Sequence, residues 1–312
     1  MAINAEVYKI IYPSDINKIL RGIDVIGKNM LPLSWKSAQS FTTNHIRSLC
    51  YGDGKFVAGD DNGKIGYSTD GITWIAIPQS FTTSRIYSLC YGDGKFIAGD
   101  ASGKIRYSTD AMTWKAISQD FTTSSIYSIC YGNEKFIASG ASDKIGYSTD
   151  GITWKTITQD FTTYSINSLC YGNEKFIAGS DDGKMAYSTD GMTWKAISQD
   201  FTTSAIESIC YGNGKFVAGG NGKMGYSTDG ITWKPISQSF TTNSIQSVCY
   251  GNEKFVASGN GGVMGYSIDG MTWKAISQSF TTDTTFSIYY GNGKFVAVGV
   301  NGKIGYCQIG LL

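Results

Sequence analysis

Residues 41–80 read FTTNHIRSLCYGDGKFVAGDDNGKIGYSTDGITWIAIPQS, and the same order of residues returns along the rest of the chain. The Phe-Thr-Thr triplet recurs at intervals of 40, 40, 40, 40, 39 and 40 residues. It begins at Phe41, Phe81, Phe121, Phe161, Phe201, Phe240 and Phe280. Self-similarity at a fixed period of about 40 residues predicts an array of one structural unit.

Each unit reads as four short strands. In the first unit these strands are expected at residues 46–51, 55–58, 64–67 and 73–77, and Gly, Asn and Asp residues separate them. Short apolar runs divided by such turn residues are typical of all-β proteins. Four strands in about forty residues, repeated, predict one blade of a β-propeller.

The two ends of the chain complement each other. The unit that starts at Phe280 stops at Leu312 without a Thr-Trp strand, while Leu33-Ser34-Trp35-Lys36 precedes the first Phe-Thr-Thr triplet. We therefore predict that residues 31–312 form a seven-bladed β-propeller of four-stranded blades. An N-terminal strand near residues 33–39 should complete the last blade and close the ring, which hides two sheet edges.

Residues 1–30 stand outside the repeat. Residues 6–12 could form a strand, and residues 15–26 have a helical apolar stripe of Ile16, Ile19, Leu20, Ile23 and Ile26. We expect a strand and helix appended to the propeller. It either caps one face of the ring or serves for docking to a second copy or an assembly partner, and both alternatives remain open.

Composition and charge exclude several classes of protein. The chain has 312 residues with 39 Gly and 4 Pro, and 41% are hydrophobic while 16% are charged, which argues against disorder. With 26 basic and 25 acidic residues the net charge is +1, so we expect no nucleic-acid partner. No membrane span and no export signal are recognisable, which predicts a cytoplasmic protein, or one released without a classical signal peptide or carried in a secreted particle.

One turn of the repeat resembles a known motif. Ser68-Thr69-Asp70-Gly71-Ile72-Thr73-Trp74 resembles the Asp-box of BNR-type propellers, Ser/Thr-x-Asp-x-Gly-x-Thr-Trp, although one residue is missing between Asp and Gly, and Ala111 replaces the glycine in the second unit. The resemblance implies a structural turn in which the Asp accepts backbone N–H groups and the Trp packs between blades. That family contains sialidases, other glycosidases, and sugar-binding or surface-adhesion proteins.

The residues for glycoside hydrolysis are poorly represented. Glycosidases hold a carboxylate pair, or a Tyr with a Glu, around one sugar, and sialidases add three arginines. Glu207 is the most unusual acid, because its strand position holds other residue types in the remaining units. Those residues are Arg47, Tyr87, Tyr127, Asn167, Gln246 and Phe286, and the other arginines are Arg21, Arg85 and Arg106. A Glu, two Arg and two Tyr around a channel mouth form a conceivable catalytic site, but unselected variation at an exposed ring is the better explanation of this set. We therefore predict no enzymatic activity and rank a sialidase-like glycosidase last.

Neither metal nor cofactor chemistry is indicated. His45 is the only histidine, and the chain has no C-x₂-C pair. Six of the seven cysteines occupy one strand position, where Tyr289 stands in the seventh unit. We expect these cysteines to be reduced, buried apolar groups, and we expect no metal site and no cofactor.

The differences between units gather after Phe-Thr-Thr and in the turn between the second and third strands. These connections lie on one face of a propeller, so their variation indicates either ligand contact on that face or relaxed surface loops, and both alternatives remain open. We predict glycan-binding sites there, between blades, formed by Asp60, Asp61, Asn62, Asp100, Asp182, Asn221, Asn260 and Asn301 with Phe81 and Thr82. The second choice is the opposite face, where Tyr51, Tyr67 and Trp74 and their repeats could stack on a sugar ring.

These features favour a multivalent carbohydrate-binding protein, a lectin or adhesin with several similar weak sites. Avidity for clustered ligands can exceed single-site affinity by roughly 10²–10⁴. The plan is similar to that of tachylectin-type propeller lectins, and glycans on cell surfaces or glycoproteins are the expected partners. The alternative is a non-catalytic structural or receptor-recognition component of a phage-tail-like or surface assembly, attached through residues 1–30.

Overall fold

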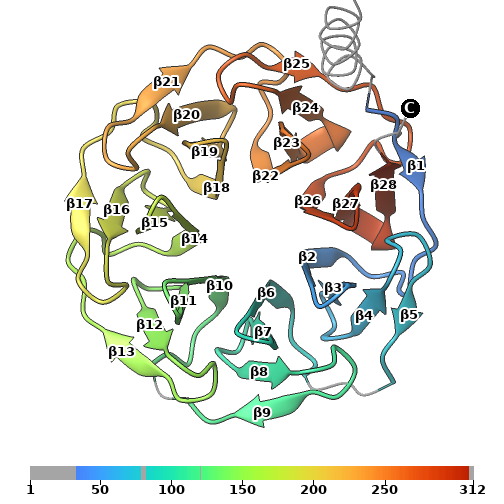
Figure 1. Ribbon diagram of the computed structural model, residues 1–312, viewed down its shortest axis with the longest axis horizontal. Coiled ribbons are helices and arrows are strands. Elements are labelled where there is room, and N and C mark those ends of the chain that lie inside the picture. Colours follow the sequence, from blue (N-terminus) through green and yellow to red (C-terminus); the bar gives the residue numbers. More distant parts are fainter. Residues whose placement is uncertain (1–32, 79–81, 120, 309–312) are drawn as a thin grey trace, which may run out of the picture.

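The first strand of each repeat lines the centre of a ring, and the next three strands follow outward (Figure 1). The computed structural model describes residues 33–78, 82–119 and 121–308. In these residues seven antiparallel sheets of four strands each are arranged around one axis. The predicted all-β, seven-bladed propeller is confirmed. Residues 1–30, the predicted appendage, lie outside the described residues.

The strands are short and their bounds repeat from blade to blade. The inner strands are β2 (Ile46–Gly52), β6 (Ile86–Gly92), β10 (Ile126–Gly132), β14 (Ile166–Gly172), β18 (Ile206–Gly212), β22 (Ile245–Gly251) and β26 (Thr285–Gly291). The second strands are β3 (Lys55–Asp60), β7 (Lys95–Asp100), β11 (Lys135–Gly140), β15 (Lys175–Ser180), β19 (Lys215–Gly220), β23 (Lys254–Gly259) and β27 (Lys294–Gly299). The third strands are β4 (Ile65–Ser68), β8 (Ile105–Ser108), β12 (Ile145–Ser148), β16 (Met185–Ser188), β20 (Lys223–Ser227), β24 (Met264–Ser267) and β28 (Ile304–Gln308). The outer strands are β5 (Ile75–Ala76), β9 (Lys115–Ile117), β13 (Lys155–Ile157), β17 (Lys195–Ile197), β21 (Lys234–Ile236), β25 (Lys274–Ala275) and β1 (Lys36–Ser37), and the 3₁₀ turns are η1 (Asn260–Gly262) and η2 (Val300–Gly302).

The ring closes through the N-terminal strand, as predicted. β1 pairs antiparallel with β28, so that Lys36 faces Tyr306 and Ser37 faces Gly305. Trp35 stacks on the Phe280 ring at a centroid distance of 5.5 Å. The last blade therefore contains strands from both ends of the described chain, and the edge of β28 is covered.

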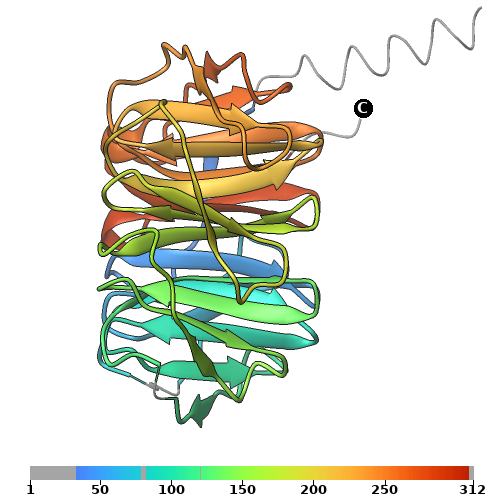
Figure 2. The same ribbon diagram turned by 90° about the vertical axis from the view of Figure 1, so that its left-hand side faces the viewer.

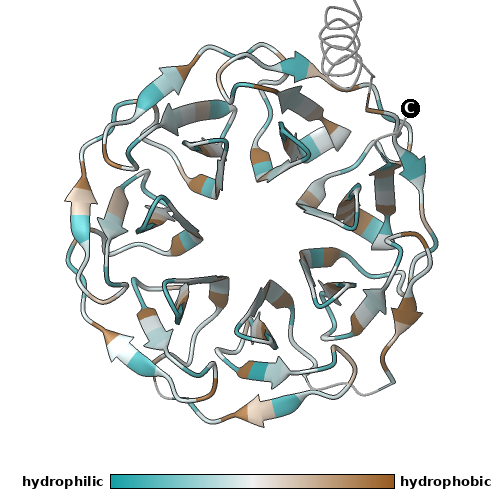
Figure 3. Cartoon of the chain, viewed as in Figure 1, coloured by the Kyte–Doolittle hydropathy of each residue, from teal (hydrophilic) through white to brown (hydrophobic). Residues whose placement is uncertain are grey.

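The hydrophobic core lies between neighbouring blades. Phe176 of the fourth blade is fully buried and belongs to one cluster with Ile137 of the third blade. At the end of β14, a Cβ on Gly172 would lie 2.1 Å from the Tyr211 ring of the next blade, so only glycine fits there. Figure 3 shows hydrophobic residues in the strands of every blade and hydrophilic stretches on the outer strands other than β5, which consists of Ile75 and Ala76.

The Ser-Thr-Asp turn, Ser68–Thr73 in the first blade, is held by one carboxylate. Asp70 Oδ1 accepts hydrogen bonds from the backbone N–H groups of Ile72 and Thr73, both at 2.8 Å, and from the Ser68 hydroxyl at 2.9 Å. The backbone N–H of the equivalent Thr113, helped by further hydrogen bonds and opposed by partial burial, lowers the pKa of Asp110 to about 2. These carboxylates stabilise the turn from the third to the fourth strand.

The two flat faces of the ring carry different connections (Figure 2). On one face the turn after the second strand lies beside the segment that enters the first strand, as the hydrogen bond from Asp181 N to Ser165 O at 2.9 Å shows. We call this the variable face, and the face with the Ser-Thr-Asp turns the constant face. No helix in the described parts of the chain is long and apolar enough to cross a bilayer.

Candidate functional site

The site begins with a β-bulge in every inner strand. In β14, Ile166 faces Ser180 and Ser168 faces Gly179, so that Asn167 has no partner across the ladder. A bulge leaves its extra residue unpaired and re-aims that side chain. The same register shift occurs in all seven blades, and the residues at the bulges are Arg47, Tyr87, Tyr127, Asn167, Glu207, Gln246 and Phe286.

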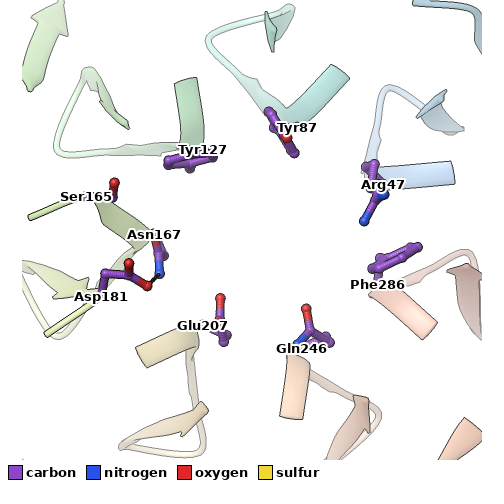
Figure 4. A pocket seen from close by; sticks show the side chains of 9 residues that line it. All are labelled: Arg47, Tyr87, Tyr127, Ser165, Asn167, Asp181, Glu207, Gln246 and Phe286. Atoms are coloured by element: carbon purple, nitrogen blue, oxygen red, sulfur yellow. Dashed lines mark hydrogen bonds between the residues drawn. The ribbon is translucent and has the colours of Figure 1, made fainter. Parts of the chain in front are cut away.

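These seven side chains surround the mouth of the central channel on the variable face. Together with Ser165 and Asp181 they line a cavity of about 330 Å³ (Figure 4). We call this cavity the channel mouth. Because the bulge residue differs in nearly every blade, the channel mouth has no sevenfold symmetry although the fold around it does.

One side of the channel mouth is basic, and its main charge is already paired. Arg47 donates from Nε to Asp61 Oδ1 at 2.7 Å and from Nη2 to Asp61 Oδ2 at 3.1 Å. The guanidinium of Arg47 also lies 3.9 Å from the centroid of the Phe286 ring. Arg85 is more exposed, with its Nε 3.6 Å from Asp61, and it donates to the Tyr87 hydroxyl at 3.3 Å.

The opposite side is acidic. Figure 4 shows Asp181, Asn167 and Glu207 across the channel mouth from Arg47. Asn167 Nδ2 donates to Asp181 Oδ1 at 3.2 Å. Burial, and then the negative charge of Asp181, raise the pKa of Glu207 above its ordinary value. None of the ion pairs in the described part of the chain involves Asp181 or Glu207.

Aromatic and amide groups complete the wall. Tyr87 and Tyr127 pack edge to face with ring centroids 5.1 Å apart. Gln246 lies between Glu207 and Phe286 and donates from Nε2 to the Ser244 hydroxyl at 3.1 Å. The channel mouth thus offers flat apolar surface, amide donors and acceptors, and opposite charges on opposite sides, which are the ingredients of a ligand site.

Two of the aspartates predicted to bind glycans are structural. Asp60 is buried, and its carboxylate accepts hydrogen bonds from the backbone N–H groups of Asn62 and Lys64 and from the side chains of Thr42 and Asn44. Asp100 is buried in the same way, with Thr82 as its hydroxyl partner at 2.7 Å. Since these interactions occupy the carboxylates, both residues stabilise the turn after the second strand in this conformation.

The other predicted residues are spread around the variable face. Asp182 is half-buried and accepts hydrogen bonds from the hydroxyls of Thr162 and Ser180, while Asp61 pairs with Arg47. Four side chains are exposed, Asn62, Asn221, Asn260 and Asn301, and Phe81 lies outside the described residues. The structure brings only Asp61 beside the channel mouth, and glycan binding by the exposed residues stays a prediction.

The second-choice aromatic residues pack between blades. Trp74 is 4% exposed and contacts the Phe41 ring at a centroid distance of 5.9 Å. Tyr51 lies over Gly291 of the last blade, where a Cβ would lie 2.2 Å from its ring, and Tyr67 packs against a cluster that joins the first two blades. These rings offer little free face to a sugar.

A second cavity of about 420 Å³ lies at the constant-face end of the channel. It is lined by the repeated Leu/Ile/Val, Cys and Tyr residues of the inner strands and by Tyr289. All seven cysteines are free thiols, and burial raises the pKa of Cys90 to about 12. Cys130, Cys170 and Cys210 are partly exposed to the channel rather than fully buried as expected. This end is nearly uniform, in contrast to the channel mouth.

Two features were not singled out from the sequence. Asp181 and Ser165 join the channel mouth from a turn and a loop, and their only signal was variability between units. Five glutamines that stand two residues before a Phe-Thr-Thr triplet tie neighbouring turns together, namely Gln119, Gln159, Gln199, Gln238 and Gln278. Gln199 Nε2, for example, donates to Gly183 O at 2.6 Å and to Thr202 O at 2.8 Å. This glutamine recurs in the repeat and could have been recognised there.

The fold and the central channel define the chain as a seven-bladed propeller with a cavity at each end of its axis, one with a varied lining and one with a nearly uniform lining. No protein-family model and no curated protein matches the sequence. Among solved structures, YCF48 from Cyanidioschyzon merolae is 16% identical with a TM-score of 0.70, and the match covers 88% of this chain and 98% of that one. A structure of YCF48 bound to D1 peptide is 17% identical with a TM-score of 0.73, covering 90% and 98%.

Virginiamycin B lyase from Staphylococcus aureus is also similar. It is 13% identical with a TM-score of 0.79, and the match covers 90% of this chain and all (100%) of that one. The prediction that the chain is not an enzyme is therefore wrong, because lyases have the same fold and the architecture does not argue against enzymatic activity. The sequence argument from arginines and carboxylates concerned glycosidases alone. At this identity the likeness shows the fold and does not transfer the lyase activity.

Proposed function

We propose that this propeller is a recognition protein that binds an extended polypeptide segment at the channel mouth. The observation that carries the proposal is the set of bulge residues, which differ in type yet surround one cavity with opposite charges on opposite sides. The remainder of the inner strands repeats with few changes. Ligand contact accounts for why the seven positions are unlike one another and why they meet in one place.

The size and chemistry of the channel mouth support a peptide. Its volume of about 330 Å³ is at the lower end of the range for ligand pockets, roughly 300–1,000 Å³, so it accepts a few side chains. Asn167 and Gln246 have amide groups that match main-chain N–H and C=O groups. Tyr87, Tyr127 and Phe286 present apolar surface to side chains.

The comparison with solved structures adds support of a different kind. The YCF48 propeller has been seen bound to D1 peptide, so a propeller of this shape can hold a polypeptide. The low identity means that this support concerns the class of ligand. The residues proposed to bind come from the geometry of this chain alone.

Display of random 12-residue peptides against the full chain tests the proposal. Selected peptides are measured by calorimetry against wild type, Tyr127→Ala and Gln246→Ala. Loss of one well-packed contact is worth about 1–2 kcal/mol, so we expect roughly 5- to 30-fold weaker binding for each variant. Glu174→Gln, in an exposed turn on the constant face, is the matched control and should bind like wild type.

Failure of the selection to enrich any peptide would contradict the proposal. Enriched peptides whose affinity is the same for wild type, Tyr127→Ala and Gln246→Ala would contradict it equally, because their site would lie elsewhere.

Multivalent carbohydrate binding remains a second candidate, favoured by repeated grooves on the outside of the ring. One groove, about 430 Å³, lies between residues 196–200 and Trp233, and an equivalent one, about 450 Å³, lies between residues 116–119 and Trp154. Repeated grooves suit a clustered ligand. A glycan array separates the two functions, since glycan binding that survives Tyr127→Ala but is lost in Gln199→Ala would favour the second.

A further inference from the structure

We propose that the polypeptide bound at the channel mouth is anchored by a lysine or arginine side chain that lies between Asp181 and Glu207. This inference rests on the proposed function and adds the charge of the ligand to it. It is carried by a difference between the two sides of the channel mouth in how their charges are paired.

The basic side has its counter-ion within the protein. Arg47 and Asp61 form a bidentate pair, the strong geometry for a guanidinium and a carboxylate. Arg85 adds one more positive charge, but its side chain is 52% exposed and its Nε is 3.6 Å from Asp61, so water and Asp61 share its charge. A ligand anion gains little there because the inner arginine is already satisfied.

The acidic side lacks a counter-ion. Asp181 and Glu207 lie on neighbouring blades and face the same cavity, and within the described residues the only side-chain donor to either carboxylate is the Asn167 amide. Glu207 is half-buried while Asp181 is exposed, so the two carboxylates repel each other across the cavity and Glu207 also loses part of its hydration. A cation between them relieves both effects, so the channel mouth is electrostatically incomplete on this side only.

An organic cation suits this place better than a metal ion. The described residues contain no group of three or more metal-ligating side chains, whereas Ca²⁺ takes about 6–8 oxygen ligands. Tyr127 belongs to the blade before that of Asn167 and lies beside Asn167 in the cavity wall, where it adds an aromatic ring with its apolar faces. A lysine or arginine stem packs on such a face while its charged end reaches carboxylates. The geometry therefore favours a basic side chain.

The test uses the peptides selected against the full chain. Each lysine in a selected peptide is replaced by acetyl-lysine and each arginine by citrulline, one at a time, and affinity is measured by calorimetry. Neutralisation of the anchoring residue should weaken binding at least about 10-fold, the effect of one charge-assisted hydrogen-bonded pair. Neutralisation of other basic residues should change affinity less than about 2-fold.

A double-mutant cycle assigns the partner. In the variant Asp181→Asn/Glu207→Gln the neutralised and native peptides should bind with nearly equal affinity. Asp283→Asn is the matched control, because this exposed carboxylate lies on the same face outside the cavity. In the Asp283→Asn variant, the native peptide should still bind more tightly than the neutralised peptide by the same factor as in wild type.

The outcomes separate the anchor from the function. Some selected peptides could depend on Tyr127 and Gln246 for binding and yet contain no basic residue, or keep their affinity when their basic residues are neutralised. Such peptides would contradict the proposal of a basic anchor and leave the proposed function standing. The same holds if the difference between the peptides persists in Asp181→Asn/Glu207→Gln. Absence of any peptide that depends on the channel mouth would overturn both.

Discussion

The two ends of the central channel are built from the same seven strands, yet they differ in almost every respect. At the constant-face end the inner strands repeat Leu, Ile or Val, then Cys and Tyr, and each Tyr covers a glycine of a neighbouring blade. At the channel mouth the bulge residues are basic, acidic, amide and aromatic. Packing between blades restricts the first set. The bulge places the second set outside the hydrophobic clusters between blades, so these residues can differ from blade to blade while the fold is kept.

The largest expected effect comes from opening the ring. Deletion of residues 1–40 removes β1 together with Leu33 and Trp35, which are buried against the last blade, and it exposes the edge of β28. Cooperative thermal unfolding should be lost and the protein should aggregate. Deletion of residues 1–28 keeps β1 and is the control. A monodisperse, cooperatively unfolding protein after the longer deletion would contradict the closure of the ring by β1.

The next effect separates the core from the exposed variable face. Phe176→Ala removes a fully buried ring between blades and should cost about 3–5 kcal/mol in the free energy of unfolding, measured with urea. Tyr164→Ala removes an aromatic side chain of similar size that is 55% exposed on the variable face. Its cost should be within about 0.5 kcal/mol. Equal costs for the two changes would show that the core is not where the structure places it.

A smaller effect distinguishes two copies of the same turn. Ala111 has a φ of 68°, a backbone conformation that costs a non-glycine residue about 1–2 kcal/mol, whereas the equivalent residue in the next blade is Gly151 with a φ of 72°. Ala111→Gly should therefore stabilise the protein by about 1 kcal/mol, and Gly151→Ala should destabilise it by at least as much. Thermal and urea unfolding of both variants measure this, and a loss of stability in Ala111→Gly would disprove the strain.

The smallest effect concerns the charge at the channel mouth. The raised pKa of Glu207 means that its ionisation disfavours the folded state, so the stability that its neutral form gives is present below the ordinary pKa of about 4.3 and is lost as the pH rises through the folded-state value. Glu207→Gln should match wild type near pH 4 and be more stable at pH 7, by less than about 0.5 kcal/mol because the site is partly solvated. Urea unfolding at both pH values checks this. A stability difference that shrinks as the pH rises would contradict the sign.

Much of the fold could be predicted because it depends on patterns that repeat. The 40-residue period predicted the blades, and the complementary ends predicted that Trp35 and its neighbours close the ring. The role of Asp70 was implied by the resemblance of its turn to the Asp-box. The turns depend on residues that are close in sequence. The pairing of strands, including that of β1 with β28, follows from the position of each strand in the repeat.

The candidate site was less accessible. Glu207 stood out in the sequence as the exception at a strand position, but nothing there showed that a bulge aims this position into one cavity or that Asp181 joins it from a turn. Asp60 had the residue type expected for a sugar ligand, yet burial and four hydrogen bonds occupy its carboxylate. Such assignments depend on which groups meet in three dimensions, which residue type alone does not reveal.

A sevenfold symmetric channel mouth tests the account most directly. Asn167 is kept, and the other bulge residues are replaced by asparagine, namely Arg47, Tyr87, Tyr127, Glu207, Gln246 and Phe286. Because none of these side chains belongs to the hydrophobic clusters between blades, the variant should fold into the same ring with a melting temperature near that of wild type. Its affinity for peptides selected against wild type, measured by calorimetry, should fall more than about 100-fold. A folded symmetric variant that binds those peptides as tightly as wild type would contradict the assignment of the channel mouth as the recognition site.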